Sequence, residues 1–283
     1  MSIRLICLDL DGTTLRRDGT ISERTVAALR RAMAAGATVT IATGRMHGSA
    51  AIFGRRIGIN GPIISSNGAL IRDVAGKTWL HRPLPASAVA AAAEVVPGSD
   101  VQVELYTPDT AYVRDVAGRQ RHLLQWWIGL IRSWAGLVLS LQYMLVYRTR
   151  PLDRCRGPVD KIYLEGRDAA RLQEVAAHIM AATPEPLSLC SSGPWNLELT
   201  APGVSKGSAV AWLVERFGLA IDQVLVAGDS YNDLSMFDLD CLKIAMGNAE
   251  DGLKERASFV TASNEDDGVA RAVERFVLGE ATV

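Results

Sequence analysis

Strand-like apolar runs alternate with helix-like segments at both ends of this chain, and this alternation constrains the fold more than any other feature. Residues 3–8 read as a buried strand, 22–36 as a helix with a serine N-cap, and 37–45 as a second strand. Beyond residue 204 the order is helix, strand, helix, strand, helix over 205–218, 223–230, 231–239, 242–248 and 267–277. This alternation predicts an α/β domain, a parallel sheet with helices on both faces.

The middle of the chain follows a different pattern. Residues 100–115 alternate apolar and polar side chains around a Thr-Pro-Asp turn, which predicts an antiparallel hairpin. A strand, a helix and two more strands follow, at 160–166, 168–182, 187–192 and 195–200. We therefore expect an α+β unit over 84–199, inserted into an α/β domain made of residues 1–83 and 200–283.

Composition and charge are those of an ordinary water-soluble protein. The 283 residues are 48% apolar and 22% charged, with a formal net charge of −1. No overall field favours nucleic acid or an anionic membrane surface, so we expect neither as a partner. Because the N-terminal apolar run is short and interrupted by Asp9, we expect no signal peptide and a cytoplasmic location. Four scattered cysteines predict reduced thiols rather than disulfides or a zinc site: Cys7, Cys155, Cys190 and Cys241.

Polar side chains gather where the predicted parallel strands end. Asp9 and Asp11 follow the first strand in "LICLDLDGTTL", and "ATGR" at 42–45 follows the next. "GDSYND" at 228–233 follows a later strand, and Lys206 stands at the start of a helix. Ligands of open parallel sheets bind beyond the carboxyl ends of the strands, so we expect these residues to share one site.

Several carboxylates converging at one sheet edge would repel one another, and a hard divalent cation relieves that repulsion. The carboxylates belong to Asp9, Asp11, Asp229 and Asp233. Mg²⁺ prefers a few carboxylate oxygens and takes other ligands from water and phosphate. Lys206, Thr43 and the amides around Gly12 and Gly44 suit phosphate oxygens, helped by helix N-termini. One aspartate can then attack phosphorus while the other handles a proton.

These segments resemble a known family. "DLDGTTL", "IATGR", the lysine in "GVSKGSA" and "GDSYNDLSMF" are similar in type and order to the four motifs of the haloacid dehalogenase (HAD) superfamily. "SSNGA" and "AMGNA" further resemble the Cof-type sugar-phosphate phosphatases. The inserted unit lies between the second and third motifs, like the type IIB cap of that group. The resemblance implies a Rossmann-like core with an inserted α+β cap that selects the substrate.

The resemblance also implies roles for individual residues. Asp9 is implied as the nucleophile and a Mg²⁺ ligand. Asp11 is implied as general acid and then base, with its backbone carbonyl on the metal, and Asp229 as the metal carboxylate. The implied phosphate-binding residues are Leu10, Thr43, Gly44, Lys206 and Asn232. Within this superfamily, phosphatases and phosphomutases carry an aspartate at the position of Asp11.

Three further residues are expected to support the site. Asp233 is implied to orient the metal ligands or Lys206. Arg45 either contacts the substrate or braces an acidic loop. Asn67 either belongs to the site or serves only the Asn-Gly turn.

Together, the motifs predict a Mg²⁺-dependent phosphatase acting on a small phosphorylated metabolite through an aspartyl-phosphate. A sugar phosphate is the first candidate substrate and a phosphorylated cofactor the second. A phosphomutase on the same core and a non-catalytic metabolite-binding protein are the alternatives. We expect a monomer or a homodimer.

One segment departs from the rest of the predicted cap. Residues 123–147 hold three of the six tryptophans and a single charged residue, Arg132. We expect this segment in the core of the cap or at a subunit interface. A substrate-pocket wall and membrane attachment are the less favoured alternatives.

Overall fold

The computed structural model describes residues 2–94, 100–117 and 148–280. Its central sheet has five strands in the order β14-β13-β12-β1-β2, and every pairing is parallel. The strands are β1 (Leu5–Leu8), β2 (Thr38–Ile41), β12 (Val224–Gly228), β13 (Leu242–Ala245) and β14 (Phe259–Val260). The predicted α/β class is confirmed, because continuous apolar runs form strands that are buried on both faces.

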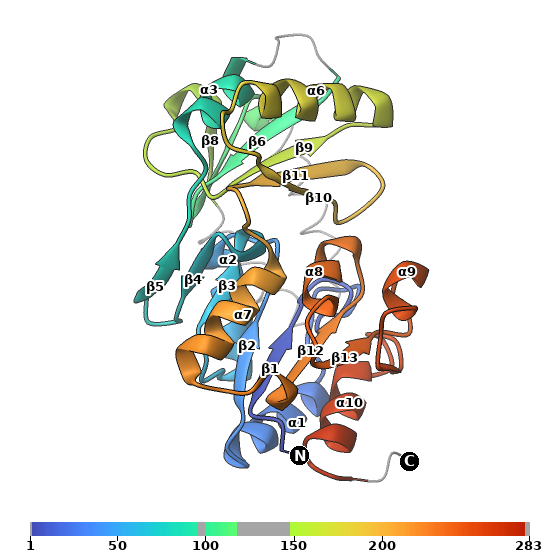
Figure 1. The fold of residues 1–283 in the computed structure, drawn as a ribbon. Helices are drawn as coiled ribbons and strands as arrows, with labels where there is room; N and C mark the ends of the chain where they lie inside the picture. Colours follow the sequence, from blue (N-terminus) through green and yellow to red (C-terminus); the bar gives the residue numbers. More distant parts are fainter. Residues whose placement is uncertain (1, 95–99, 118–147, 281–283) are drawn as a thin grey trace.

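Helices cover both faces of this sheet, and together they form the core (Figure 1). On one face α1 packs against α10, and on the other α7 packs against α8. The helices are α1 (Glu23–Ala34), α2 (His47–Ile57), α7 (Lys206–Phe217), α8 (Leu234–Phe237), α9 (Asp251–Lys254) and α10 (Gly268–Phe276). The helix expected over 231–239 is instead a 3₁₀ turn (Tyr231–Asp233) followed by the short α8.

A small antiparallel sheet links the core to the inserted unit. It contains β3 (Ile63–Ser65), β4 (Leu70–Arg72) and β5 (Thr78–His81). A bridge between Ala42 and Ile64 attaches it to the end of β2. It therefore places the turn at 66–68 directly beside the "ATGR" loop, where Asn67 N–H bonds the Thr43 carbonyl.

In its described residues, the inserted unit, which we call the cap, is a six-stranded sheet in the order β10-β11-β9-β6-β7-β8, covered by α3 and α6. Its elements are α3 (Ala86–Glu94), β6 (Gln102–Tyr106), β7 (Thr110–Val113), β8 (Arg148–Pro151), β9 (Lys161–Glu165), α6 (Ala169–Ala181), β10 (Ser188–Cys190) and β11 (Asn196–Thr200). The predicted hairpin is confirmed as the antiparallel pair β6–β7. Division of the chain at residues 84 and 199 stays a prediction.

The two faces of the cap sheet differ in chemistry. Val103, Ile162 and Leu199 belong to the apolar cluster that packs beneath α3 and α6. Side chains alternate along a strand, so the neighbouring residues point to the opposite face. That face carries Glu104, Tyr106, Lys161, Tyr163 and Glu198. In Figure 1 the helices lie on the outer side of the cap, which leaves this polar face toward the core.

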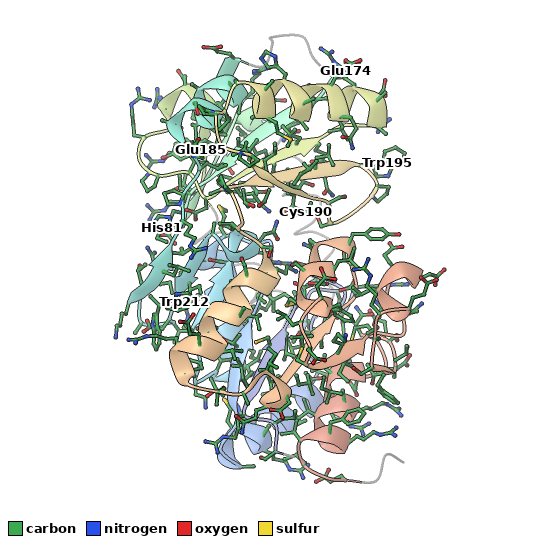
Figure 2. The ribbon with its side chains drawn as sticks, in the orientation of Figure 1. His81, Glu174, Glu185, Cys190, Trp195 and Trp212 are labelled. Atoms are coloured by element: carbon green, nitrogen blue, oxygen red, sulfur yellow. The ribbon has the colours of Figure 1, made fainter. Side chains whose placement is uncertain are left out.

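The four cysteines are free thiols, as predicted. Cys190 lies on the side of the cap that faces the core (Figure 2). Within the described residues, no helix has both the length and the apolar character needed to span a bilayer. The Trp-rich segment 123–147 lies outside the described residues.

Candidate active site

Lys206 lies at the centre of a buried charged cluster beyond the ends of β1 and β12. Its Nζ donates to Asp9 Oδ1 and to Asp233 Oδ1, each at 2.7 Å, and to Asn232 Oδ1 at 3.3 Å. Its side chain is fully buried. Burial lowers the pKa of Lys206, but the two carboxylates outweigh burial and leave the pKa above its ordinary value. The lysine is therefore a fixed cation that holds three motifs together.

Asp233 holds the loop after β12. Its Oδ2 accepts hydrogen bonds from the backbone N–H groups of Asp229 at 3.0 Å and Ser230 at 3.1 Å, while Oδ1 accepts from Lys206. Both carboxylate oxygens are thus engaged. Glycine is needed at 228, because a Cβ there would lie 2.6 Å from Asp233 Cγ. Asp233 therefore contacts both Lys206 and the backbone of the loop that carries Asp229.

Asp229 is held from the loop that follows β1. Thr13 Oγ1 donates to Asp229 Oδ1 at 2.6 Å, and Asn248 Nδ2 donates to the Gly12 carbonyl at 2.8 Å. Gly12 has φ +75°, and a Cβ at that position would overlap the Asp229 carboxylate. Only glycine both adopts this backbone conformation readily and leaves that space.

The acidic cluster has the donor chemistry of a magnesium site. One carboxylate oxygen each from Asp9, Asp229 and Asp233 lie within 4.8 Å of one another. Burial, followed by the charge of Asp233, raises the pKa of Asp229 to about 7. Burial also raises the pKa of Asp9, and Lys206 offsets only part of that effect. The single charge of Lys206 does not balance these carboxylates, so the cluster keeps an excess of negative charge that a divalent cation would neutralise. Because Asp233 is fully engaged, Asp9 and Asp229 are the carboxylates available to it.

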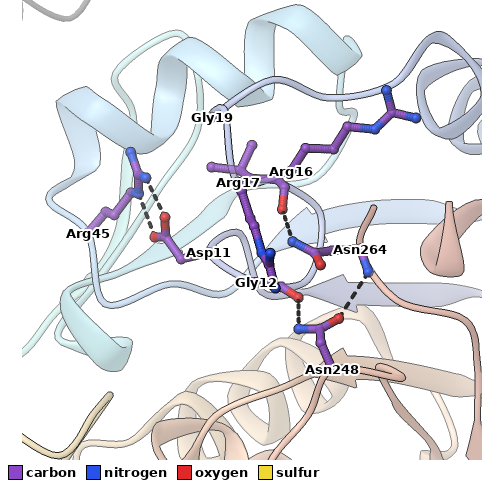
Figure 3. Close-up of a pocket in the computed structure, with 9 residues that line it drawn as sticks. Asp11, Gly12, Arg16, Arg17, Gly19, Arg45, Asn248 and Asn264 are labelled. Atoms are coloured by element: carbon purple, nitrogen blue, oxygen red, sulfur yellow. Dashed lines mark hydrogen bonds and ion pairs between the residues drawn. The ribbon is translucent and has the colours of Figure 1, made fainter. Parts of the chain in front are cut away.

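Asp11 does not join the acidic cluster through its carboxylate. It forms a two-bond ion pair with Arg45, in which Nε donates to Asp11 Oδ2 at 2.6 Å and Nη2 to Oδ1 (Figure 3). Burial raises the pKa of Asp11, but the Arg45 charge and hydrogen bonds bring it below its ordinary value. The Asp11 side chain is still 57% exposed, and the pair lines a cavity of about 340 Å³. Asp11 therefore faces space that a ligand can enter.

The predicted phosphate-binding loop follows β2. Thr43 is buried, and its Oγ1 accepts a hydrogen bond from the Arg45 N–H at 3.2 Å. Its hydroxyl hydrogen remains available to an anion. Within the described chain, the Gly44 N–H makes no hydrogen bond. Leu10 is fully buried in the turn that follows β1, and Asn232 lies in the Lys206 cluster.

Comparison with known proteins identifies the family. The family profile for haloacid dehalogenase-like hydrolases matches residues 6–273. The chain belongs to this family.

Relatives of this HAD-like hydrolase cover nearly its whole length. A 5-amino-6-(5-phospho-D-ribitylamino)uracil phosphatase of Bacillus subtilis is 28% identical, covering 98% of this chain and 99% of its own. A pyridoxal phosphate phosphatase of Escherichia coli is also 28% identical, covering 96% and 98%. The structure of a HAD-like hydrolase from B. subtilis superposes with a TM-score of 0.80, 26% identity, and 96% and 99% coverage. The predicted family and enzyme class, a phosphoric monoester hydrolase, are confirmed.

Sequence reasoning about this hydrolase missed two cap residues that reach the core. Lys161 Nζ donates to the Gly44 carbonyl at 2.7 Å and to Glu198 Oε2 at 2.6 Å. Asn67 Nδ2 donates to the same Glu198 oxygen at 2.6 Å, so Asn67 lies between cap and core. Charged residues on β9 and β11, in strands whose alternate positions are apolar, were the available signal.

Proposed function

We propose that this chain is a Mg²⁺-dependent phosphatase that hydrolyses a small phosphorylated metabolite, with Asp9 as the nucleophile. The observation that carries the proposal is the charge imbalance around Lys206. One buried ammonium is shared by Asp9 and Asp233, with the Asp229 carboxylate in the same cluster. Buried carboxylates that outnumber the nearby cations are costly unless a metal cation binds them. A cation bound there would in turn attract and stabilise an incoming phosphoryl group.

Each residue has a proposed task. An Asp9 oxygen attacks phosphorus, the bond to the leaving alcohol breaks, and Asp11 gives that alcohol a proton. Water, deprotonated by Asp11, then releases inorganic phosphate and restores Asp9. Lys206, Thr43 and the Gly44 N–H hold the phosphoryl oxygens.

The carboxylates of Asp9 and Asp229 and the Asp11 carbonyl would hold Mg²⁺. When bound, the ion neutralises negative charge that builds up on the transferring phosphoryl group.

Arg45 must release Asp11 before that residue can act as an acid. A guanidinium that makes two hydrogen bonds to a carboxylate favours the ionised form. The incoming phosphate is an alternative anion for Arg45, and binding it would free Asp11 to take up a proton. Arg45 therefore has both of the roles that the sequence left open, bracing an acidic residue and contacting substrate.

The cap is proposed to select the organic part of the substrate, while the core supplies the chemistry. The relatives are named for a phosphorylated ribitylaminouracil and for pyridoxal phosphate. We keep a sugar phosphate as the first candidate class and a phosphorylated cofactor as the second.

A phosphate-ester panel tests the proposal. The purified protein is incubated with Mg²⁺ and sugar phosphates, pyridoxal phosphate, FMN or p-nitrophenyl phosphate, and released phosphate is measured. We expect turnover of several compounds and trapping of labelled phosphate on Asp9. Isomerised sugar phosphate without free phosphate would identify a phosphomutase instead. No turnover on the whole panel would favour a binding protein.

A further inference from the structure

Lys161 is a buried cation of the cap whose contacts lead to the phosphate-binding loop of the core. Its side chain is 3% exposed. Besides bonding Glu198 and the Gly44 carbonyl, its Nζ lies 4.9 Å from the ring centre of Tyr106 and 5.6 Å from that of Tyr163. The two rings stack with their centres 6.0 Å apart. Such enclosure leaves the ammonium little freedom to turn elsewhere.

The loop at 43–45 is held by its three carbonyl groups. The Thr43 carbonyl accepts from Asn67 N–H at 3.0 Å, and the Arg45 carbonyl accepts from Ser66 N–H at 2.8 Å. Ser66 and Asn67 have φ values of 49° and 55°, a conformation that aims both N–H groups at the loop. The Gly44 carbonyl is the one held from the cap, by Lys161.

Glu198 closes a ring of contacts around this loop. Its Oε2 accepts from both Lys161 and Asn67, each at 2.6 Å, and its Oε1 accepts from Ser192 Oγ at 2.6 Å. The carboxylate neutralises Lys161 and ties it to the same turn that holds Thr43. Burial raises the pKa of Glu198, but Lys161 and these hydrogen bonds bring it below its ordinary value. The Glu198 carboxylate therefore stays ionised beside Lys161.

Gly44 is the residue that most needs such a constraint. Glycine has the widest backbone freedom, so the peptide between Gly44 and Arg45 can rotate unless its carbonyl is held. Rotation would take that carbonyl away from Lys161 and cost the ammonium one of its hydrogen bonds. A bulkier residue at 44 would crowd this turn, because its Cβ would lie 3.0 Å from Asn67 Oδ1 and Asn67 would have to move.

We propose that Lys161 and Glu198 are positioning residues, which fix the Gly44 peptide so that Thr43 and the Gly44 N–H present a rigid phosphate site. This inference deepens the proposed phosphatase function and rests on it. It also makes part of the cap necessary for chemistry on every substrate, whatever the organic group.

The deciding variant is the double substitution Lys161→Met/Glu198→Met. Lys161→Met alone would bury the Glu198 carboxylate without its cation and strongly destabilise the fold, whereas replacing both charges is often tolerated. We expect an unfolding midpoint close to wild type. We also expect kcat/KM to fall roughly 100-fold, by the same factor for p-nitrophenyl phosphate and the best metabolite, because a loop displaced by about 1 Å has this effect.

Three comparisons isolate positioning from stability. Glu198→Gln keeps the Lys161 bond to Gly44 but removes the charge that balances Lys161, so kcat/KM should fall less than in the double variant. Arg171→Met removes an exposed cap cation, paired with Glu174 on α6, and should change nothing. Lys161→Met/Glu198→Gln replaces the first double variant if that one does not fold, since the introduced amide can still bond Asn67 and Ser192.

The possible outcomes separate this inference from the proposed function. A folded double variant with activity within threefold of wild type would overturn it, as would a loss confined to the metabolite. If wild type turns over nothing, the proposed function fails, and binding of inorganic phosphate with Mg²⁺ decides the inference. Equal phosphate binding by wild type and the double variant, or none by either, would then overturn it.

Discussion

Two buried lysines, one in the core and one in the cap, differ in how their charge is balanced. Lys206 bonds Asp9 and Asp233, and the Asp229 carboxylate belongs to the same cluster. Lys161 bonds a single carboxylate, that of Glu198, and a backbone carbonyl. The core cluster has an excess of negative charge, whereas the cap cluster is neutral.

This difference in charge distinguishes the proposed catalytic cluster of the core from the proposed positioning cluster of the cap. An excess of buried carboxylate raises the pKa of Asp229 to about 7, mainly through burial and next through Asp233, so the cluster favours a cation. A neutral, hydrogen-bonded pair has no such demand for a cation and can only hold its neighbours in place. Charge balance around each buried lysine is therefore the property by which we assign the proposed reaction with phosphate to the core cluster.

The largest expected effect is on activity, from Asp9→Asn. An amide of the same shape cannot attack phosphorus, so kcat should fall by more than about 10³-fold. The unfolding midpoint without Mg²⁺ should not fall, because the change removes one of the excess charges. Phosphate release and circular dichroism measure the two effects.

Asp238→Asn is the matched control for Asp9→Asn, since Asp238 lies on the surface and pairs with Arg256. It should keep wild-type activity. Substantial turnover by Asp9→Asn would remove Asp9 from the nucleophile role and with it the comparison of the two clusters.

Lys206→Met should come next. Removing the shared ammonium leaves buried carboxylates unpaired, which costs about 3–5 kcal/mol of unfolding free energy. Mg²⁺ should recover part of that loss, and every substrate should slow in parallel. Urea unfolding with and without Mg²⁺ measures this, and Lys77→Met, at the exposed turn before β5, is the control. A loss that Mg²⁺ does not reduce would argue against excess negative charge in the core cluster.

Metal removal should have a smaller effect on stability. Mg²⁺ at 100 times its dissociation constant should add about 2.7 kcal/mol to the unfolding free energy. EDTA should remove that gain and stop turnover, and Ca²⁺ should bind and inhibit, since its longer ligand distances misplace the phosphoryl group. Asp229→Asn should abolish the Mg²⁺ gain, while the neutral cap cluster predicts the same gain in Glu198→Gln. Full activity in excess chelator would refute the metal assignment.

The affinity for Mg²⁺ should depend on pH. The pKa of Asp229 is raised to about 7 without metal, so below that pH protons compete with Mg²⁺ for the carboxylate. Apparent affinity should weaken as pH falls from 8 to 6 and level off above about 8. Calorimetric titration at three pH values measures it, and a constant affinity would contradict the raised pKa.

The core was predictable from sequence because its signals are local. Buried parallel strands read as apolar runs, and the carboxylates follow them directly, as Asp9 follows β1. The strands β4 and β5 escaped prediction because strands of three or four residues are too short to show alternation. Helix α2 begins without a side-chain cap and is buried along most of its length, so it lacks the usual helix signals.

The cap cluster was not predictable for a different reason. Lys161 and Glu198 are 37 residues apart, and their contact depends on the register in which β9 pairs with β11. The sequence shows that both strands alternate, but not which residues face each other. The Asp11–Arg45 pair likewise depends on how two loops meet, which the motifs alone do not specify.

The smallest effect should come from a charge pair that is balanced and exposed. Arg24 on α1 donates to both carboxylate oxygens of Glu274 on α10, at 3.2 and 2.7 Å. The Arg24 side chain is 42% exposed, so water already solvates much of its charge. Arg24→Ala should therefore cost only about 0.2–1 kcal/mol of unfolding free energy, and less at high salt. Urea unfolding at low and high salt measures the loss, and activity should not change. A loss as large as that of Lys206→Met would mean that burial and charge imbalance do not set the ranking of these clusters.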